Sequence, residues 1–136
     1  MVNLEWNDRL LTGVKKLDDD HKQVLEIMRE LQKTIPNQDY DRSLKLFNSL
    51  LEAGAAHFAF EESYLAKAHY PYIEEHIQYH HDLVQKVKEV KRMCETPGER
   101  DNLEEAFNYM AEFLIDDVIA GDQQFRSYLE SRSLVR

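Results

Sequence analysis

The chain has 136 residues, 43% of them hydrophobic and 32% charged, which is the balance expected of a single globular domain spanning 1–136. Its net charge of −9 argues against a nucleic-acid partner, because neutralising phosphates requires clustered lysines and arginines. The apolar runs are too short to span a bilayer, the first residues lack the parts of a signal peptide, and Cys94 is the single cysteine, so we expect a cytoplasmic protein with no membrane partner.

The first helix is predicted from about Asp18 to the Pro36-Asn37 break, with Asp18 as its cap. Residues 1–17, which precede it, lack a helical period and are predicted to form an ordered arm. Spacings of three and four residues define the inward stripe of this helix, which comprises His21, Val24, Leu25, Met28, Leu31 and Ile35.

A second helix is predicted from about Asp41 to Lys67. Gly54 lies in its middle, where glycine is unfavourable by about 1 kcal/mol relative to alanine, so we expect a neighbouring helix to approach closely there. The inward positions of this helix are Phe47, Leu50, Gly54, His57, Glu61 and Tyr64.

The third helix follows a break at Tyr70-Pro71, and Pro71 is predicted to occupy its first position. It carries the most regular stripe in the chain: Ile73, His76, His80, Leu83, Val87, Val90 and Cys94. Its buried cysteine is expected to be an inert core residue. The dipeptide Pro97-Gly98 ends this helix.

The fourth helix is predicted to start near Asp101, to bend at Gly121, and to leave the last fifteen residues as a separate helical turn. The connections between helices are short, which favours antiparallel neighbours. The predicted fold is therefore all-α, an up-down-up-down four-helix bundle with an N-terminal arm. The inward stripe of the last helix comprises Leu103, Phe107, Met110, Phe113, Leu114, Asp117 and Val118.

Polar side chains interrupt these inward stripes on all four helices. One buried histidine is more often a hydrogen-bonded core residue than a ligand, and one buried aspartate is often part of an ion pair between helices. Six such residues on converging faces instead predict a metal site, because buried polar groups without partners are strongly unfavourable. The six are His21, His57, Glu61, His76, His80 and Asp117.

The spacing of these residues indicates which metals they suit. His57 and Glu61 are four residues apart, as are His76 and His80, so each pair shares one helix face. Imidazole nitrogens combined with carboxylate oxygens favour iron, zinc or manganese over calcium or magnesium. The number of candidate ligands exceeds the four of a tetrahedral zinc site, which favours two metals bridged by carboxylates.

With these motifs the sequence resembles the hemerythrin family, in particular its single-domain bacterial members. The resemblance covers nearly the whole chain, and as a set its motifs are highly specific. They are Trp6 and Gly13-Val14 in the arm, Asp18-x-x-His21, His57-Phe58-Ala59-Phe60-Glu61-Glu62, Tyr70-Pro71, His76-x-x-x-His80, and Asp122.

The resemblance implies a centre of two non-haem iron ions, bridged by an oxo or hydroxo group and by carboxylates, that binds dioxygen reversibly at one iron. It assigns His21 and His57 to the iron with an open position, and His76 and His80 to the second iron. It assigns both bridging carboxylates as well, to Glu61 and Asp122. Because Asp122 lies five residues after Asp117, a local bulge or the bend at Gly121 must bring it inward.

The chain departs from the family pattern at Asp117, where the family places a fifth histidine. Neither Asp116 nor His81 offers a replacement, since each lies about 100° around the helix from the inward face. Three interpretations remain open: Asp117 ligates the second iron, acts through a bound water, or leaves the site mononuclear or mostly empty. The added negative charge should stabilise the ferric state, which predicts faster autoxidation than in a five-histidine relative.

The expected function is dioxygen carriage, storage or sensing without turnover, since no catalytic residue beyond the ligands is visible. The alternatives are a di-iron redox enzyme acting on oxygen, peroxide or nitric oxide, and an iron store. We expect a monomer, and a sensing role would need a separate partner protein. Four inward apolar residues are candidates for an oxygen pocket, although core packing explains each equally well: Leu25, Phe58, Leu114 and Val118.

Overall fold

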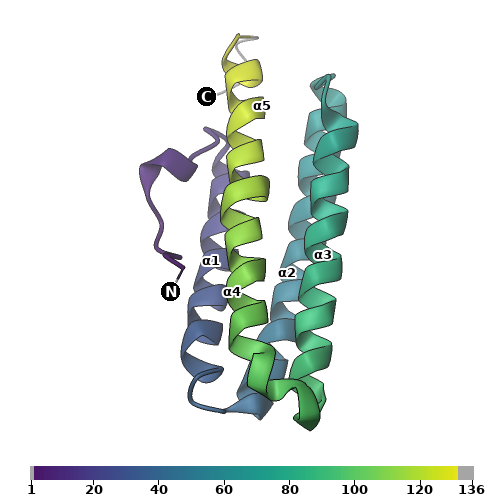
Figure 1. Cartoon of the computed structure of the whole chain (residues 1–136). Helices are drawn as coiled ribbons and strands as arrows, with labels where there is room; N and C mark the ends of the chain where they lie inside the picture. Colours follow the sequence, from purple (N-terminus) through teal and green to yellow (C-terminus); the bar gives the residue numbers. More distant parts are fainter. Residues whose placement is uncertain (1, 132–136) are drawn as a thin grey trace.

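The computed structural model describes residues 2–131, apart from the side chains of residues 9, 117–120, 122 and 123. Within that range all assigned secondary structure is helical, and the long helices run antiparallel as a four-helix bundle (Figure 1). The elements are η1 (Asp8–Leu10), α1 (Lys15–Thr34), α2 (Tyr40–Lys67), α3 (Ile73–Glu95), η2 (Pro97–Asn102), α4 (Leu103–Phe113), η3 (Leu114–Ile119) and α5 (Ala120–Ser131). The predicted fold class is thus confirmed.

The start of α1 differs from the prediction. The helix begins at Lys15 rather than Asp18, and its N-cap residue, Val14, makes no side-chain cap. Asp18 lies inside the first turn, and its carboxylate accepts hydrogen bonds from the backbone N–H of Thr12 at 2.7 Å and from the Thr12 hydroxyl at 2.8 Å. The predicted cap is therefore wrong: Asp18 binds the arm to the helix instead.

Two turns position the next helices. Asp39 caps α2 by accepting from the backbone N–H of Arg42 at 3.2 Å, so the helix begins at Tyr40, one residue before the predicted start. His69 is exposed and adopts a left-handed conformation with a φ of 58°. The turn continues through residues 71 and 72, and α3 begins at Ile73. The prediction that Pro71 occupies the first position of this helix is therefore wrong.

The fourth column of the bundle consists of three consecutive helical segments. The short 3-10 helix η2 precedes these segments and includes Asp101, so the α-helix α4 starts at Leu103 rather than near Asp101. The segment η3 is π-helical, and α5 continues from it to Ser131, so the expected break into a separate final turn is wrong. A local bulge or a bend at Gly121 was expected to bring Asp122 inward, and this π segment ends two residues before Gly121. A π turn brings residues five apart, rather than four, to equivalent positions.

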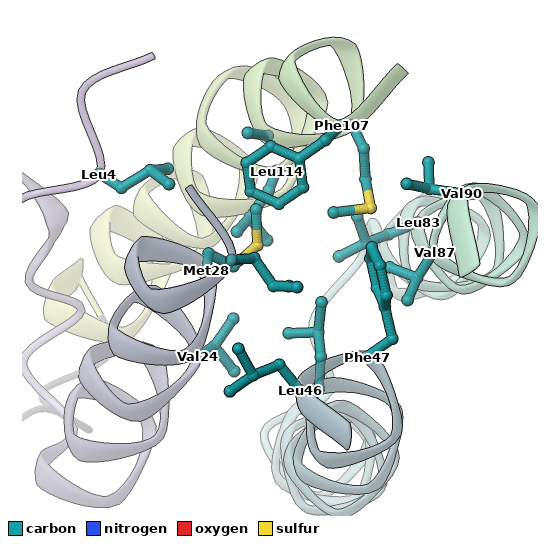
Figure 2. Close-up of a cluster of buried hydrophobic side chains, with 14 of the residues drawn as sticks. Leu4, Val24, Met28, Leu46, Phe47, Leu83, Val87, Val90, Phe107 and Leu114 are labelled. Carbon is teal, nitrogen blue, oxygen red and sulfur yellow. The ribbon is translucent and has the colours of Figure 1, made fainter. Parts of the chain in front are cut away.

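Buried side chains form two apolar clusters along the bundle. The larger one fills the half that includes Phe47, Val87 and Phe107 (Figure 2). The smaller one comprises Leu17, Leu65, Tyr70, Phe125 and Leu129, with Tyr64 packed against it. Cys94 is fully buried, as predicted.

Gly54 does not mark a close approach of helices, contrary to the prediction. A Cβ atom built there would meet only Phe58 of the same helix, at an ordinary 3.9 Å. Replacing Gly54 with alanine is therefore tolerated sterically. Among the described residues, no helix combines the length and apolar character that crossing a membrane requires.

Candidate metal centre

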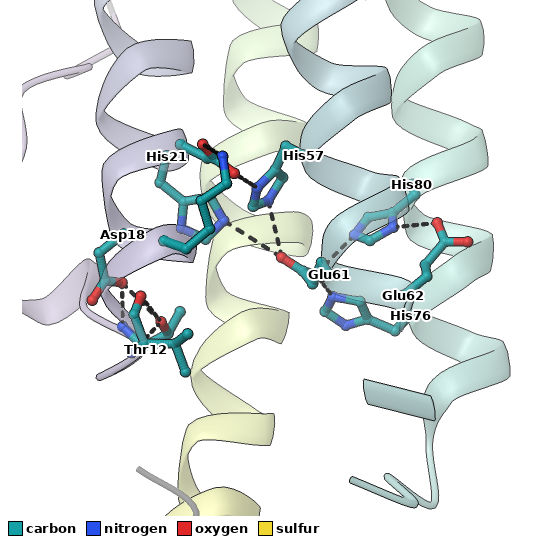
Figure 3. A network of polar contacts seen from close by, with 11 residues as sticks. Thr12, Asp18, His21, His57, Glu61, Glu62, His76 and His80 are labelled. Carbon is teal, nitrogen blue, oxygen red and sulfur yellow. Dashed lines mark hydrogen bonds and ion pairs between the residues drawn. The ribbon is translucent and has the colours of Figure 1, made fainter. Parts of the chain in front are cut away.

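Five of the predicted polar residues meet between the two apolar clusters. They come from three helices and are all buried, with exposed fractions of at most 4% (Figure 3). They are His21 from α1, His57 and Glu61 from α2, and His76 and His80 from α3. Each lies on the inward stripe of its helix, as the sequence predicted, because neighbouring positions three and four residues away carry core side chains.

The Glu61 carboxylate lies at the centre of this group. Its Oε2 atom is 2.9 Å from Nε2 of His57 and 3.7 Å from Nε2 of His21. Its Oε1 atom is 3.0 Å from Nε2 of His80 and also contacts Nε2 of His76. Each carboxylate oxygen thus faces one pair of histidines (Figure 3).

This arrangement divides the site into two groups of possible ligands that share one carboxylate. His21, His57 and Glu61 form one group, and Glu61, His76 and His80 form the other, with the ligand atoms of each group within 4.8 Å of one another. A carboxylate shared in this way is the geometry expected of a bridge between two cations.

Two of the donor atoms lie close together without a hydrogen bond, as expected of atoms that bind a cation. Nε2 of His57 and Oε2 of Glu61 are buried and have no hydrogen-bond partner, although they are only 2.9 Å apart. A buried polar atom without a partner is unfavourable by about 1–3 kcal/mol, and a bound cation would remove that penalty at both atoms. The nitrogen and oxygen donors suit iron, zinc or manganese.

The electrostatics keep Glu61 ionised. Burial alone would raise the pKa of its carboxyl, but polar interactions with the imidazoles of His21, His57, His76 and His80 together hold that pKa well below its ordinary value. An anionic carboxylate can offer one oxygen to each side of the site, which a protonated carboxyl could not do.

Two carboxylates outside the centre contact the outer nitrogens of its histidines. Nδ1 of His57 lies 3.2 Å from Oδ2 of Asp20, and Nδ1 of His80 lies 2.9 Å from Oε2 of Glu62. From the sequence Asp20 was not singled out, and Glu62 was included only as part of a motif, so both contacts were missed. Because each contact joins two helices, no spacing within one helix could have revealed it.

Aromatic rings pack against two histidines of the centre. The ring of Phe58 stacks on His80 with centroids 3.9 Å apart, and Phe125 lies 5.5 Å from His76. Of the candidate oxygen-pocket residues, Leu25, Phe58 and Leu114 are buried in the larger cluster. The fourth, Val118, has a side chain outside the described residues.

The side chains of Asp117 and Asp122 also lie outside the described residues, so their roles stay predictions. Along the chain, Asp117 falls within the π segment η3, and Asp122 falls in α5. The rejected replacements Asp116 and His81 are both exposed, which agrees with the prediction that neither substitutes for the missing histidine.

Comparison with known proteins identifies related chains. A family model described as the hemerythrin HHE cation binding domain matches residues 12–120. The bacteriohemerythrin of Pseudomonas aeruginosa (strain LESB58) is 28% identical over 91 residues, which cover 67% of this chain and 60% of that relative. Bacteriohemerythrins of Stenotrophomonas maltophilia and Clostridium acetobutylicum are each 23% identical, over 96% and 88% of this chain and 84% and 96% of the relatives. The chain thus spans less than two thirds of the Pseudomonas relative in that match.

Proposed function

The chain belongs to the hemerythrin HHE cation-binding domain family, and from that premise we propose that its buried histidines and carboxylates hold two non-haem iron ions and that it binds dioxygen reversibly. The observation that carries this proposal is the central position of Glu61, with one pair of histidines facing each of its oxygens. Iron in such a centre supplies the electrons that allow dioxygen to bind and leave.

The residues of the chain have distinct roles in this proposal. His21 and His57 would hold one iron, and His76 and His80 would hold the other. Glu61 spans both metals and contributes one negative charge between them, which lowers the repulsion between the cations. Asp122 is the second bridging carboxylate, and Asp117 takes the place of the family's fifth histidine.

The apolar surroundings serve reversible binding. Leu25, Phe58 and Leu114 are buried in the larger apolar cluster, Phe58 stacks on His80, and with Val118 these residues form the proposed oxygen pocket. An apolar pocket excludes water and free protons, which limits oxidation of the centre and loss of the bound gas.

Oxygen equilibrium measurements on the iron-loaded protein test the proposal. Repeated cycles between argon and oxygen should give the same change in the absorption spectrum each time, with one dioxygen taken up per chain. Sustained consumption of oxygen, peroxide or nitric oxide would favour a redox enzyme instead. Iron release without any oxygen-dependent spectrum would favour an iron store.

A further inference from the structure

The outer edges of two histidines in the centre are each held by a carboxylate from a different helix. Asp20 on α1 reaches His57 on α2, with Oδ2 and Nδ1 3.2 Å apart. Glu62 on α2 reaches His80 on α3, with Oε2 and Nδ1 2.9 Å apart. Each half of the centre therefore contains one histidine with an identified carboxylate partner.

These contacts determine which nitrogen of each ring faces the metal. A neutral imidazole carries one N–H, and a carboxylate accepts it. When Nδ1–H donates to Asp20 or Glu62, the lone pair of Nε2 is left pointing at Glu61 and the site between. Each carboxylate thereby selects the tautomer that can bind a cation and restricts rotation of the ring.

Asp20 is itself fixed on its outer side. Its Oδ1 atom accepts from Nζ of Lys16, one helical turn earlier, at 2.7 Å. Asp20, Lys16 and His57 line a groove of about 380 Å³ between α1 and α2. His57 is only 3% exposed although it lines this groove, and the carboxylate that Lys16 holds in place keeps its Nδ1–H directed to a single acceptor.

We propose that Asp20 and Glu62 are positioning residues, Asp20 for the half of the centre containing His21 and His57, and Glu62 for the half containing His76 and His80. This inference rests on the proposed function, because it assumes that both halves hold iron. Residues in such positions typically change metal affinity by about 10- to 100-fold when replaced.

The chain offers a matched control for Asp20. Asp19 lies next to it on α1 and pairs with Lys15 at 2.6 Å, also four residues apart, but it is exposed and none of its described contacts involves a histidine of the centre. The variants are therefore Asp20→Ala, Asp20→Asn, Glu62→Ala and Glu62→Gln, with Asp19→Ala as the control.

Iron release from the purified, iron-loaded protein distinguishes these variants. The protein is kept anaerobic and reduced, and transfer of iron to an excess of a ferrous chelator is followed over time. Asp20→Ala should accelerate release of one of the two irons by about 10- to 100-fold, and Glu62→Ala should accelerate release of the other. The amide variants should recover part of the loss, since an amide oxygen still accepts from N–H, and the control should change by less than about two-fold.

A spectroscopic signature separates positioning from a general loss of stability. In proton NMR of the ferrous protein, one exchangeable imidazole N–H signal should exchange faster with water in Asp20→Ala, and a different one in Glu62→Ala. A variant that is merely less stable would affect all such signals together.

Two outcomes overturn the proposal while leaving the proposed function intact. In the first, wild-type protein holds two irons, but the Asp20 and Glu62 variants release them at the wild-type rate. In the second, Asp19→Ala accelerates release as much as Asp20→Ala. If the wild-type protein holds no iron, the proposed function itself fails, and the positioning proposal fails with it.

Discussion

The contact between Asp18 and the N-terminal arm should make a large contribution to stability. The Asp18 carboxylate, 6% exposed, accepts from the backbone N–H of Thr12 at 2.7 Å, from the Thr12 hydroxyl at 2.8 Å, and from the backbone N–H of Gly13 at 3.3 Å. Thr12 is fully buried, so its donors have no access to water when the carboxylate is removed. Asp18 precedes His21 by three residues, so the same contact anchors the first turn of the helix that supplies this histidine.

Asp18→Ala should lower the free energy of unfolding by about 3–5 kcal/mol. Hydrogen bonds to charged groups contribute about 1.5–3 kcal/mol each, and two of the three here are short. The loss corresponds to a fall in Tm of about 10–17 °C. Urea denaturation followed by far-UV circular dichroism measures it directly.

Asp19→Ala is the control, because Asp19 experiences the same helix dipole but is exposed. Thr12→Val supplies a further test, since it removes the hydroxyl and keeps the shape of the side chain. Thr12→Val should lower the free energy of unfolding of the wild-type chain by about 1 kcal/mol more than it lowers that of the Asp18→Ala variant. The reasoning is wrong if Asp18→Ala and Asp19→Ala differ by less than about 1 kcal/mol.

Four further predictions concern the core and the centre. Phe125→Ala should destabilise the protein by about 3–5 kcal/mol in urea denaturation, since this ring is fully buried beside His76; a loss below about 1 kcal/mol would contradict that packing. Burial raises the pKa of the Cys94 thiol, so a thiol reagent at pH 8 should label it only after denaturation, and rapid labelling of native protein would contradict its burial. Asp117→His should slow autoxidation, measured from the decay of the oxygenated spectrum, because it removes a negative charge that favours ferric iron; an unchanged rate would refute that role. Removing iron with a chelator should lower Tm in calorimetry, as loss of any ligand of the native state does, and an unchanged Tm would mean that the metal does not bind the folded chain.

The sequence was sufficient to predict the helices and the inward residues of the centre. The stripe through His76, His80 and Leu83 repeats at helical spacing, and it could bury its apolar members only by turning both histidines inward. His57 and Glu61 followed from the same argument on α2. The 3.6-residue period of an α-helix is a property of neighbouring residues, so it can be detected in a single sequence.

Features that depend on contacts between segments could not be predicted in this way. Aspartate is a common residue at helix N-caps, so Asp18 was predicted to cap its helix. In the structure the arm folds back, and Thr12 donates a hydrogen bond to the Asp18 carboxylate. Asp20 and Glu62 find their histidine partners on other helices. Gly54 suggested a close helix approach, but a missing side chain in a sequence does not tell whether a neighbour fills the space.

The π segment η3 could also not be predicted from helical periodicity alone. The five-residue interval between Asp117 and Asp122 suggested an irregularity, because both residues were expected to face inward. The backbone indeed changes to π-helical geometry over Leu114–Ile119. That expectation came from the family resemblance, since α-helical periodicity alone selects Asp117 and leaves Asp122 outside the stripe.

Iron content per chain, measured together with the absorption spectrum, tests the central claim most directly. Protein purified from iron-supplied cells should contain about two iron ions per chain, one for each ligand group that shares Glu61. Its spectrum should change on exposure to oxygen and return when oxygen is removed. One iron or less per chain, or a rapid and irreversible oxidation, would contradict the account and would indicate that Asp117 has given this centre a different function.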